Sequence, residues 1–386
     1  MGSAIFEKID MHLQNHRMGT WTGTFRDYLG MVMKQPSLAQ RAHARLYTMI
    51  KRTGVRVDDE GKEHYAFFEH DLFGIDEPLA RVVEYFKAAA MGSDVGRRIL
   101  LLYGPPSSGK SQLVILLKRG LEVYTQTDEG AIYAIADCPQ HEDPLNLMPH
   151  PLRQDFQAET GIHIEGELCP LCALHLREQY EGDVYRVPVK RIFYSEKERL
   201  GIGTFVPSDP KSQDISELVG SIDLSTVGDY GSESDPRAYR FDGELNVANR
   251  GLMEFIEMLK ADERFLYVLL TLSQEKNIKT GRFPLIYADE CVISHTNETE
   301  FNEFLANSTV LLCLLSISNR INELACPSWI VRAHERGEIA GATAYSSQQF
   351  LVGHGAFHGS GHAFHRHGAC QRNYECSDIK RVMSKT

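Results

Sequence analysis

Eight consecutive residues in the first third of the chain have the types and the spacing that bind a polyphosphate. They fit the pattern G-x-x-x-x-G-K-[ST] without a mismatch and are Gly104, Pro105, Pro106, Ser107, Ser108, Gly109, Lys110 and Ser111. In such a loop, backbone N–H groups and the positive end of the next helix surround the phosphates, and glycine lets the main chain approach them. The Lys110 ammonium would lie against the β- and γ-phosphates, and the Ser111 hydroxyl would ligate Mg²⁺. We therefore predict a nucleoside triphosphate site.

The segments on either side of this loop are those that the motif requires. Before it, Ile99 to Tyr103 form a continuous apolar run, which is typical of a buried strand in a parallel sheet. After it, apolar residues recur at helical spacing at Leu113, Val114, Leu116 and Leu117. An ordinary glycine turn between a strand and a helix is the alternative, but the complete motif between these flanks favours the phosphate-binding loop.

Two short pairs of metal-binding residue types lie further along the chain. They are Cys138 with His141 and Cys169 with Cys172. Each C-x₂-[CH] pair can bend both ligands toward one point, which suits a tetrahedral Zn²⁺ site, and four protein ligands leave no open position for a substrate. We predict a structural zinc site, with His163 and His175 as substitutes for His141. Cys169 and Cys172 alone would also fit a redox pair or two buried thiols.

In AAA+ ATPases, carboxylates at the carboxyl end of a strand orient Mg²⁺ and the attacking water. Two acidic pairs in this sequence are candidates for that role. Asp242 and Glu244 follow one short predicted strand, and a well-patterned helix is predicted after them. Asp289 and Glu290 follow the apolar residues of PLIYADE and fit the residue-type pattern better, because Gly243 separates the first pair.

The choice between the pairs depends on the next segment. Val292–Asn297 is similar to the sensor-1 strand of AAA+ ATPases, whose terminal Asn contacts the γ-phosphate or the water. If Asn297 has that role, the acidic strand must come earlier in the chain, which favours Asp242 and Glu244. Asp289 and Glu290 then become a solvated turn before the sensor strand.

The composition is that of an ordinary globular protein, long enough at 386 residues for two or three domains. A net charge of −11 argues against broad nucleic-acid binding. No apolar run approaches the roughly 20 residues that span a bilayer, and the start of the chain lacks the apolar core of a secretory signal. The 8 cysteines do not suggest a disulfide scaffold. We therefore expect a cytoplasmic protein without membrane or nucleic-acid partners.

Four stretches carry a family resemblance: the phosphate-binding loop, SDPKSQDISELVGSID, FDGELNVANRG and HTNETEF. From about Ile5 to Asn307 the chain resembles the PrkA family, bacterial proteins named serine protein kinases and built on an AAA+ ATPase core. The resemblance implies that Gly104–Ser111 bind ATP and that the serine residues of protein substrates are phosphorylated in the cytoplasm. We also expect a homo-oligomer.

The expected fold is α/β, an AAA+ P-loop NTPase with a parallel sheet flanked by helices. We expect a helical N-terminal region over residues 1–66, the ATPase domain over 67–307 and, within it, a zinc-binding insertion over about 137–200. Phe73, Gly74 and Ile75 are similar to the residues near the adenine base in AAA+ ATPases. The polar stretch 201–236 is either a surface loop or a contact to substrate or a neighbouring subunit.

Phosphoryl transfer to serine needs a base and an acceptor site beside the γ-phosphate, and Glu244 is the candidate base. The motifs of eukaryotic-type protein kinases do not occur in the sequence. Two alternatives therefore stay open beside a serine kinase. One is an oligomeric AAA+ ATPase that remodels protein substrates or feeds them to a protease, and the other is a truncated product that only binds ATP.

The resemblance ends after Asn307, where the family continues with a helix carrying an arginine finger, a further strand and a lid. The sequence runs instead into a tail rich in His, Gly and Ser. We interpret residues 308–386 as divergent, either frame-shifted relative to the family or disordered, with a metal-binding His tract as the alternative. Arg320 is the candidate finger. Without a lid and a trans-acting arginine, ATP would bind but hydrolysis would be slow.

Overall fold

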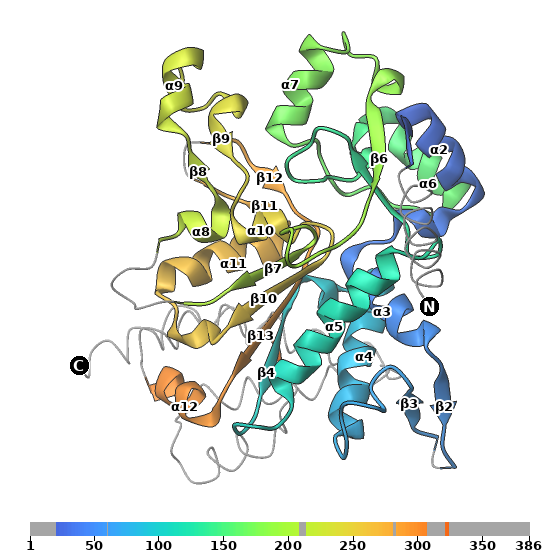
Figure 1. The fold of residues 1–386 in the computed structure, drawn as a ribbon, viewed down its shortest axis with the longest axis vertical. Helices are drawn as coiled ribbons and strands as arrows, with labels where there is room; N and C mark the ends of the chain where they lie inside the picture. Colours follow the sequence, from blue (N-terminus) through green and yellow to red (C-terminus); the bar gives the residue numbers. More distant parts are fainter. Residues whose placement is uncertain (1–20, 60, 208–213, 281–282, 307–320, 324–386) are drawn as a thin grey trace, which may run out of the picture. The chain divides into compact units, whose positions relative to one another are not determined.

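The computed structural model describes residues 21–306, except 60, 208–213 and 281–282, together with residues 321–323. Its centre is a five-stranded sheet in which every neighbouring pair is parallel. The strand order across this sheet is β14 (Ile321–Glu323), β4 (Ile99–Tyr103), β13 (Cys291–Thr296), β10 (Leu252–Ile256) and β7 (Ile202–Phe205). The strand that leads into the phosphate-binding loop therefore has a neighbour on each side. Figure 1 shows β4, β13, β10 and β7 in this order.

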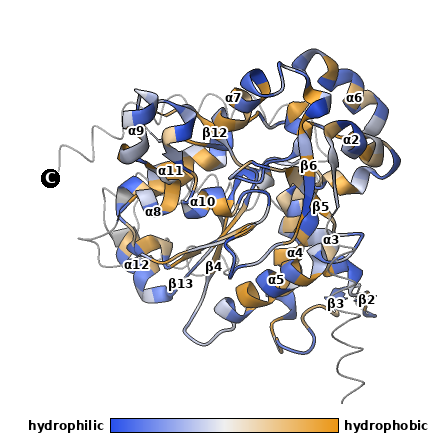
Figure 2. Cartoon of the chain, turned by 45° about the horizontal axis from the view of Figure 1, so that its top comes forward, coloured by the Kyte–Doolittle hydropathy of each residue, from blue (hydrophilic) through white to orange (hydrophobic). Residues whose placement is uncertain are grey.

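The inner strands are mostly apolar because helices cover both faces of the sheet. In β4, Ile99 to Leu102 are all buried, and Figure 2 shows hydrophobic residues concentrated along the central strands. Two strands depart from this pattern. β13 ends in Ser294, His295 and Thr296, and β10 carries Glu254 between apolar neighbours, with its side chain buried as well. A buried carboxylate in the middle of a sheet needs a partner.

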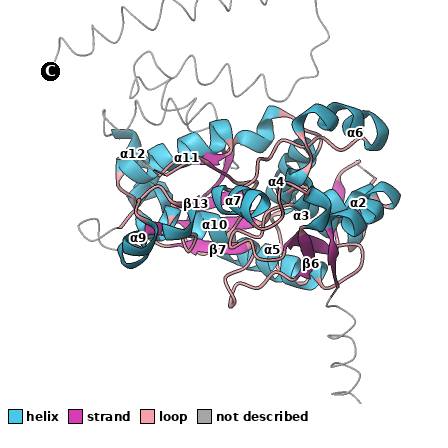
Figure 3. Cartoon of the chain, turned by 90° about the horizontal axis from the view of Figure 1, so that it is seen from above, coloured by secondary structure: helices cyan, strands magenta, loops and turns pink. Residues whose placement is uncertain are grey.

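Helices cover the two faces of the central sheet. On one face, α3 (Ala42–Arg52), α4 (Asp76–Ala90) and α5 (Lys110–Thr125) share a buried apolar cluster with β4, β10 and β13. On the other face, α11 (Glu263–Glu275) places Phe265 5.3 Å from the ring of Phe205 on β7, and Phe205 also contacts Phe255 on β10. In Figure 3, α3, α4 and α5 lie together, away from α11.

A second sheet has three antiparallel strands, β1 (Thr22–Thr24), β6 (Pro188–Ile192) and β5 (Ile132–Ile135). Strand β5 thus lies in this smaller sheet and not beside β4, the strand of the phosphate-binding loop. After β6 the chain enters the central sheet at β7. The small sheet packs with the N-terminal helix α2 (Phe25–Lys34), whose Tyr28 contacts Tyr133.

The remaining elements are short. Strands β2 and β3 form a hairpin, and the polar stretch from 201 contains β7, α8, a strand of a second hairpin and α9. The α-helices and strands not yet named are β2 (Val55–Val57), β3 (Glu63–Tyr65), α6 (Arg153–Thr160), α7 (Pro170–Glu178), α8 (Ser216–Val219), β8 (Ser221–Ile222), α9 (Leu224–Tyr230), β9 (Tyr239–Arg240), α10 (Glu244–Val247), β11 (Asn277–Ile278), β12 (Ile286–Tyr287) and α12 (Glu298–Ala306). The 3-10 helices are Pro36–Ala39, Asp94–Arg97, Pro144–Leu147, His150–Leu152, Val184–Arg186, Pro236–Ala238 and Met258–Lys260. Among the described helices, none combines the length and the apolar character needed to cross a bilayer.

Candidate nucleotide-binding and metal-binding sites

The loop between β4 and α5 has a backbone that few residues tolerate. Gly104, Ser107 and Gly109 have positive φ angles of 157°, 63° and 85°. A Cβ added at Gly109 would lie 3.2 Å from Cδ2 of Leu72 and 3.7 Å from Cδ1 of Ile75, so the backbone and the surroundings both favour glycine. No side chain in the described part of the chain caps α5, and its first N–H groups are left for an anion.

Lys110 is held inside the same loop. Its Nζ donates to the carbonyl oxygens of Gly104 (2.8 Å) and Pro105 (2.7 Å) and to Oγ of Ser108 (3.1 Å). Partial burial lowers the pKa of Lys110, and the carboxylate of Glu298 at the start of α12 opposes that shift. The Lys110 ammonium therefore lies over the loop that a phosphate would enter. It is close enough to α12 for the charge of Glu298, the first residue of that helix, to act on it.

The register of the sheet decides which side chains face the loop. Tyr103 on β4 pairs with Thr296 on β13, and His295 on β13 pairs with Ile256 on β10. Because these strands are parallel, the residues that follow them lie at one edge, and these are Gly104, Asn297 and Glu257. Figure 1 shows α12 and the β4–α5 loop at this same end of the sheet. Ligands of open α/β sheets bind at the carboxyl ends of the strands.

Glu257 and Asn297 each have a defined local structure. Glu257 has a φ of +49°, and its N–H donates to the carbonyl oxygen of His295 at 3.1 Å, so the ladder between β10 and β13 continues to this residue. Asn297 precedes α12, and its Oδ1 accepts a hydrogen bond from the N–H of Glu300 at 2.9 Å. The backbone thus fixes where both side chains begin.

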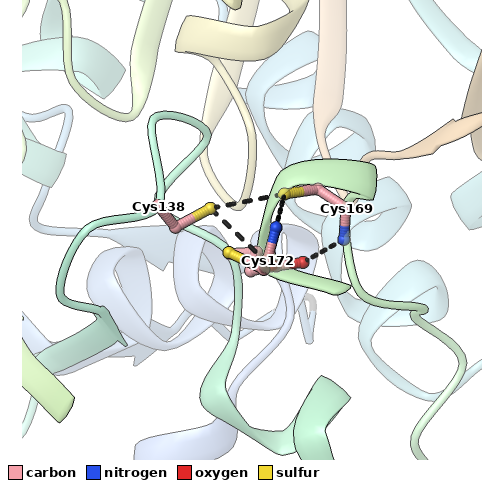
Figure 4. A group of neighbouring side chains, drawn as sticks. Cys138, Cys169 and Cys172 are labelled. Atoms are coloured by element: carbon pink, nitrogen blue, oxygen red, sulfur yellow. Dashed lines mark hydrogen bonds between the residues drawn. The ribbon is translucent and has the colours of Figure 1, made fainter. Parts of the chain in front are cut away.

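A second candidate site lies in the insertion, where Cys138, Cys169 and Cys172 converge (Figure 4). Sγ of Cys138 is 3.9 Å from Sγ of Cys169, and the N–H of Cys172 donates to Sγ of Cys169 at 3.4 Å. Glu142 completes the group, since its Oε2 accepts from the N–H of Cys169 at 2.8 Å. The four ligand atoms lie within 4.8 Å of one another, and all four residues are buried.

No ion pair to Glu142 is found among the described residues. Burial and the nearby Cys138 raise the pKa of the Glu142 carboxyl. Burial also opposes ionisation of Cys138, but hydrogen bonds from Cys169 and Cys172 hold the pKa of its thiol well below the usual range. Thiolate sulfur and carboxylate oxygen are ligands that tetrahedral Zn²⁺ accepts, so these residues fit the metal.

Comparison with known proteins places this architecture. The family described as the PrkA AAA domain matches residues 23–336. The chain belongs to the PrkA AAA domain family. The parallel sheet flanked by helices is therefore the AAA+ P-loop fold expected from the sequence. The match extends past Asn307, where we expected the resemblance to end, and β14 provides a further strand of the sheet in that region.

Two relatives show how the PrkA AAA domain occurs in longer proteins. The chain is 58% identical over 304 residues to "ATP-dependent protease PrkA" of Bacillus subtilis (strain 168), covering 78% of this chain and 48% of that protein. It is 32% identical over 251 residues to "Serine/threonine kinase YeaG" of Escherichia coli (strain K12), covering 63% of this chain and 38% of that protein. The chain thus spans about half the length of the first relative and less of the second.

Asp242 and Glu244 do not follow a strand of the central sheet, although their predicted role requires that position. The strand before them, β9, has two residues, pairs antiparallel with β8 and lies outside the central sheet. Glu244 starts α10, where Oε2 accepts from the N–H of Thr204 at 2.8 Å and Oε1 pairs with Arg199 at 2.9 Å. Burial raises the pKa of Glu244. Its carboxylate holds the outer strand β7, with β10 and β13 between β7 and β4.

The competing pair, Asp289 and Glu290, lies at the opposite edge of the sheet, because both residues come before β13. Asp289 accepts hydrogen bonds from the N–H of Ala42 and from Nζ of Lys276, both at 3.0 Å. Burial opposes its ionisation, but Lys276 and the Ala42 N–H keep the pKa of Asp289 well below its usual range. Both residues are buried, so the solvated turn expected here is wrong.

Strand β10 with Glu254 and Glu257 is what the sequence interpretation missed. Residues 251–260 were assigned to a helix after Asp242, whereas Leu252–Ile256 form the strand beside the predicted sensor strand. Helix and buried strand are hard to separate in a short apolar run by periodicity alone. The available signal was an apolar run of strand length that ends in the acidic residue Glu257.

The predicted zinc ligands meet only in part. Cys138, Cys169 and Cys172 come together, but Glu142 and not His141 is the fourth member of the group. His141 has a φ of +50° and a pKa lowered by burial. The proposed substitute His163 hydrogen-bonds Gln157 through Nδ1 at 2.9 Å. Arg320 and the tail from 324 onward lie outside the described residues.

Proposed function

We propose that this PrkA AAA domain binds Mg-ATP at Gly104–Ser111 and hydrolyses it at the carboxyl edge of the central sheet. The observation that carries the proposal is the register that brings Gly104, Asn297 and Glu257 to one edge. The loop amides and the start of α5 would hold the phosphates, and Lys110 would exchange its contacts in the loop for phosphate oxygens. Magnesium, ligated by Ser111, would neutralise charge on the β- and γ-phosphates.

Asn297 and Glu257, at the edge of the sheet, would have different roles in ATP hydrolysis. Asn297 is the candidate contact to the γ-phosphate or to the attacking water, as its place after β13 suggests. Glu257 replaces Glu244 as the candidate base, because it follows the strand next to the sensor strand. Water attacks phosphorus as the bond to the β-phosphate oxygen breaks, and Glu257 accepts the proton that the water loses.

The test compares three variants with the natural chain. Lys110→Ala should lose most of its affinity for Mg-ATP. Glu257→Gln should keep that affinity but lose about 100-fold or more in turnover, in line with the loss of a general base. Asp242→Asn, which removes an exposed carboxylate from the originally favoured pair, distinguishes the two assignments. If Asp242→Asn abolishes turnover and Glu257→Gln does not, the assignment of Glu257 is wrong.

Serine phosphorylation is the second candidate, because a relative 32% identical to this chain carries the name of a serine/threonine kinase. The acceptor would then be a serine hydroxyl in place of water, with the same loop and the same base. Label from γ-labelled ATP on protein serine, absent in Lys110→Ala, would support it. Release of free phosphate alone would support an ATPase that remodels protein substrates or feeds them to a protease, as the name of the relative 58% identical suggests for that protein.

We propose a homo-oligomer with a protein substrate, acting in the cytoplasm. The cysteines of the described part of the chain are free thiols, as in a reducing compartment, and ATP is abundant there. A net charge of −11 gives no support to nucleic acid as a partner. Sedimentation with and without Mg-ATP measures the oligomer directly, and a monomer under both conditions would contradict this part of the proposal.

We also propose that the buried group holds a structural Zn²⁺ through Cys138, Cys169 and Cys172, with Glu142 as the fourth ligand. Cys169 precedes α7, so the positive end of that helix would stabilise the charge of a zinc-bound thiolate there. Metal analysis should give about one zinc per chain, as a closed four-ligand site requires. Glu142→Gln should bind zinc more weakly and His141→Ala should not, and the reverse result would return the fourth position to His141.

A further inference from the structure

One lysine joins the ends of two neighbouring strands at the nucleotide edge of the sheet. Lys260 closes the 3-10 helix that follows β10, and its Nζ lies 2.6 Å from Oε2 of Glu257 and 2.7 Å from Oε1 of Glu300. Glu257 follows β10, whereas Glu300 belongs to the first turn of α12, which follows β13. The ammonium thus connects the candidate base to the helix that begins after Asn297.

Glu300 carries this connection to Asn297. Its N–H donates to Oδ1 of Asn297 at 2.9 Å, and its Oε2 accepts from Oγ1 of Thr296 at 3.2 Å. Lys260, Glu300 and Asn297 therefore form a continuous chain of polar contacts. These contacts link Glu257, the candidate base, to Asn297, the candidate contact to the γ-phosphate or to the attacking water.

The contacts of Lys260 with Glu257 and Glu300 form a bridge between the two strand ends. The exposure of these side chains indicates that the main role of this bridge is not to stabilise the fold. The Lys260 side chain is 49% exposed and that of Glu257 is 41% exposed, whereas Glu300 is 11% exposed. An ion pair as exposed as that of Lys260 and Glu257 contributes little to the stability of a protein. Hydrogen bonds to Glu257 and Glu300 raise the pKa of Lys260, so the lysine remains a cation in this arrangement. What the bridge fixes is the direction of two side chains.

We propose that Lys260 is a positioning residue, which holds the Glu257 carboxylate and the first turn of α12 in one arrangement so that water activation and γ-phosphate contact are coupled. This inference rests on the proposed ATP hydrolysis and adds a residue that acts through Glu257. The backbone of Glu257 has a left-handed φ of +49°, which fixes the position of its Cβ. The ion pair with Lys260 fixes the position of its carboxylate. A displacement of about 1 Å in such a group can cost about 100-fold in rate.

The experiment separates nucleotide affinity from turnover. Lys260→Met should lower turnover by about 10- to 100-fold while the affinity for Mg-ATP changes by less than about 3-fold, because the lysine touches the base and not the loop. Lys260→Arg keeps the charge and should restore at least about a third of the turnover. Glu300→Gln breaks the bridge from its other end and should resemble Lys260→Met. Lys34→Met, an exposed lysine of α2, is the matched control and should behave like the natural chain.

A double variant identifies the path of action. In a Glu257→Gln background, Lys260→Met should lower turnover by much less than it does alone, since one of the two groups that it holds is already changed. Full additivity of the two losses, unchanged turnover in Lys260→Met, or an Arg variant as inactive as the Met variant would each overturn the role of Lys260. Failure of the proposed function looks different, because then the natural chain itself would not hydrolyse Mg-ATP.

Discussion

Lys118 and Glu254 form an ion pair in the interior of the domain, between α5 and the centre of β10. Their side chains are 5% and 6% exposed, and each has a further partner, Glu196 at 2.6 Å from Lys118 and His295 at 3.2 Å from Glu254. The helix of this pair begins with Lys110 and its strand ends before Glu257. The ion pair therefore fixes the two elements that carry the candidate phosphate contact and the candidate base.

Removal of Lys118 should be strongly destabilising. Lys118→Met leaves Glu254 buried without its cation, and breaking a buried pair in this way costs about 3–5 kcal/mol of unfolding free energy. Denaturant unfolding measures the loss. Glu196→Gln is the control, since that carboxylate is 49% exposed and its loss should cost less than about 1 kcal/mol. Equal losses in both variants would contradict a special role for the Lys118–Glu254 pair.

The buried His43 should make stability depend on pH. Burial, assisted by the charge of Lys276, lowers the pKa of His43 from 6.5 to about 4. Below pH 6.5 the unfolded chain therefore binds a proton that the folded chain does not bind. From this group alone, the free energy of unfolding should fall by about 1.4 kcal/mol for each unit by which the pH is lowered from about 6.5 to about 4.

Replacement of His43 isolates this contribution from that of the carboxylates. His43→Phe should unfold with a shallower dependence on pH over the same range, although it also loses the hydrogen bond between His43 and Tyr85. Unfolding measured at pH 7 and pH 5 suffices for the comparison. An identical loss between these two pH values in both proteins would show that His43 does not titrate as its burial requires.

Gly109 should be intolerant of any side chain. Gly109→Ala places a Cβ at a φ of 85° and 3.2 Å from Leu72, so the loop must shift to accept it. We expect at least about a 10-fold loss in Mg-ATP affinity, as the amides that face the phosphates move. Gly30→Ala is the matched control, since the space around its Cβ is open and the residue lies in helix α2. Unchanged affinity in Gly109→Ala would contradict the assignment of the loop.

Loss of the cysteine group should release the metal and destabilise the insertion. Cys169→Ser with Cys172→Ser should reduce the zinc content to near zero and lower the melting temperature, because a structural metal stabilises the folded state that binds it. Cys291→Ala removes a buried thiol from β13, outside the group, and should keep its zinc. Zinc retained in the double variant would place the metal elsewhere in the chain.

The sequence predicted the parts of the site that depend on short, strongly constrained motifs. The strand, the loop and the helix around Lys110 follow from residue types that phosphate binding requires, and similarity to a sensor-1 strand predicted the strand β13, which ends just before Asn297. Glu257 was missed because the strand before it was interpreted as a helix. Two short segments of the sequence end in acidic residues, one before Asp242 and one before Glu257. Which of these segments lies beside β13 depends on the order of the strands in the sheet, and no local sequence pattern shows that order.

The insertion shows the same limit on a smaller scale. The spacing of Cys138, Cys169 and Cys172 predicts that their side chains can meet, and they do. The choice between His141 and Glu142 depends on the turn at residue 141, where a φ of +50° directs successive side chains differently from an extended chain. Residue types alone favoured the histidine.

The short strand Ile321–Glu323 has a practical consequence for anyone who prepares this protein. It pairs along β4 from Ile99 to Leu101 and is the outermost strand of the sheet. A fragment that stopped at residue 307 would expose the backbone N–H and C=O groups along that side of β4. Unpaired edge strands of this kind readily pair with strands of other molecules. Expression boundaries chosen before Glu323 should therefore yield material that self-associates through the very strand that leads to the nucleotide.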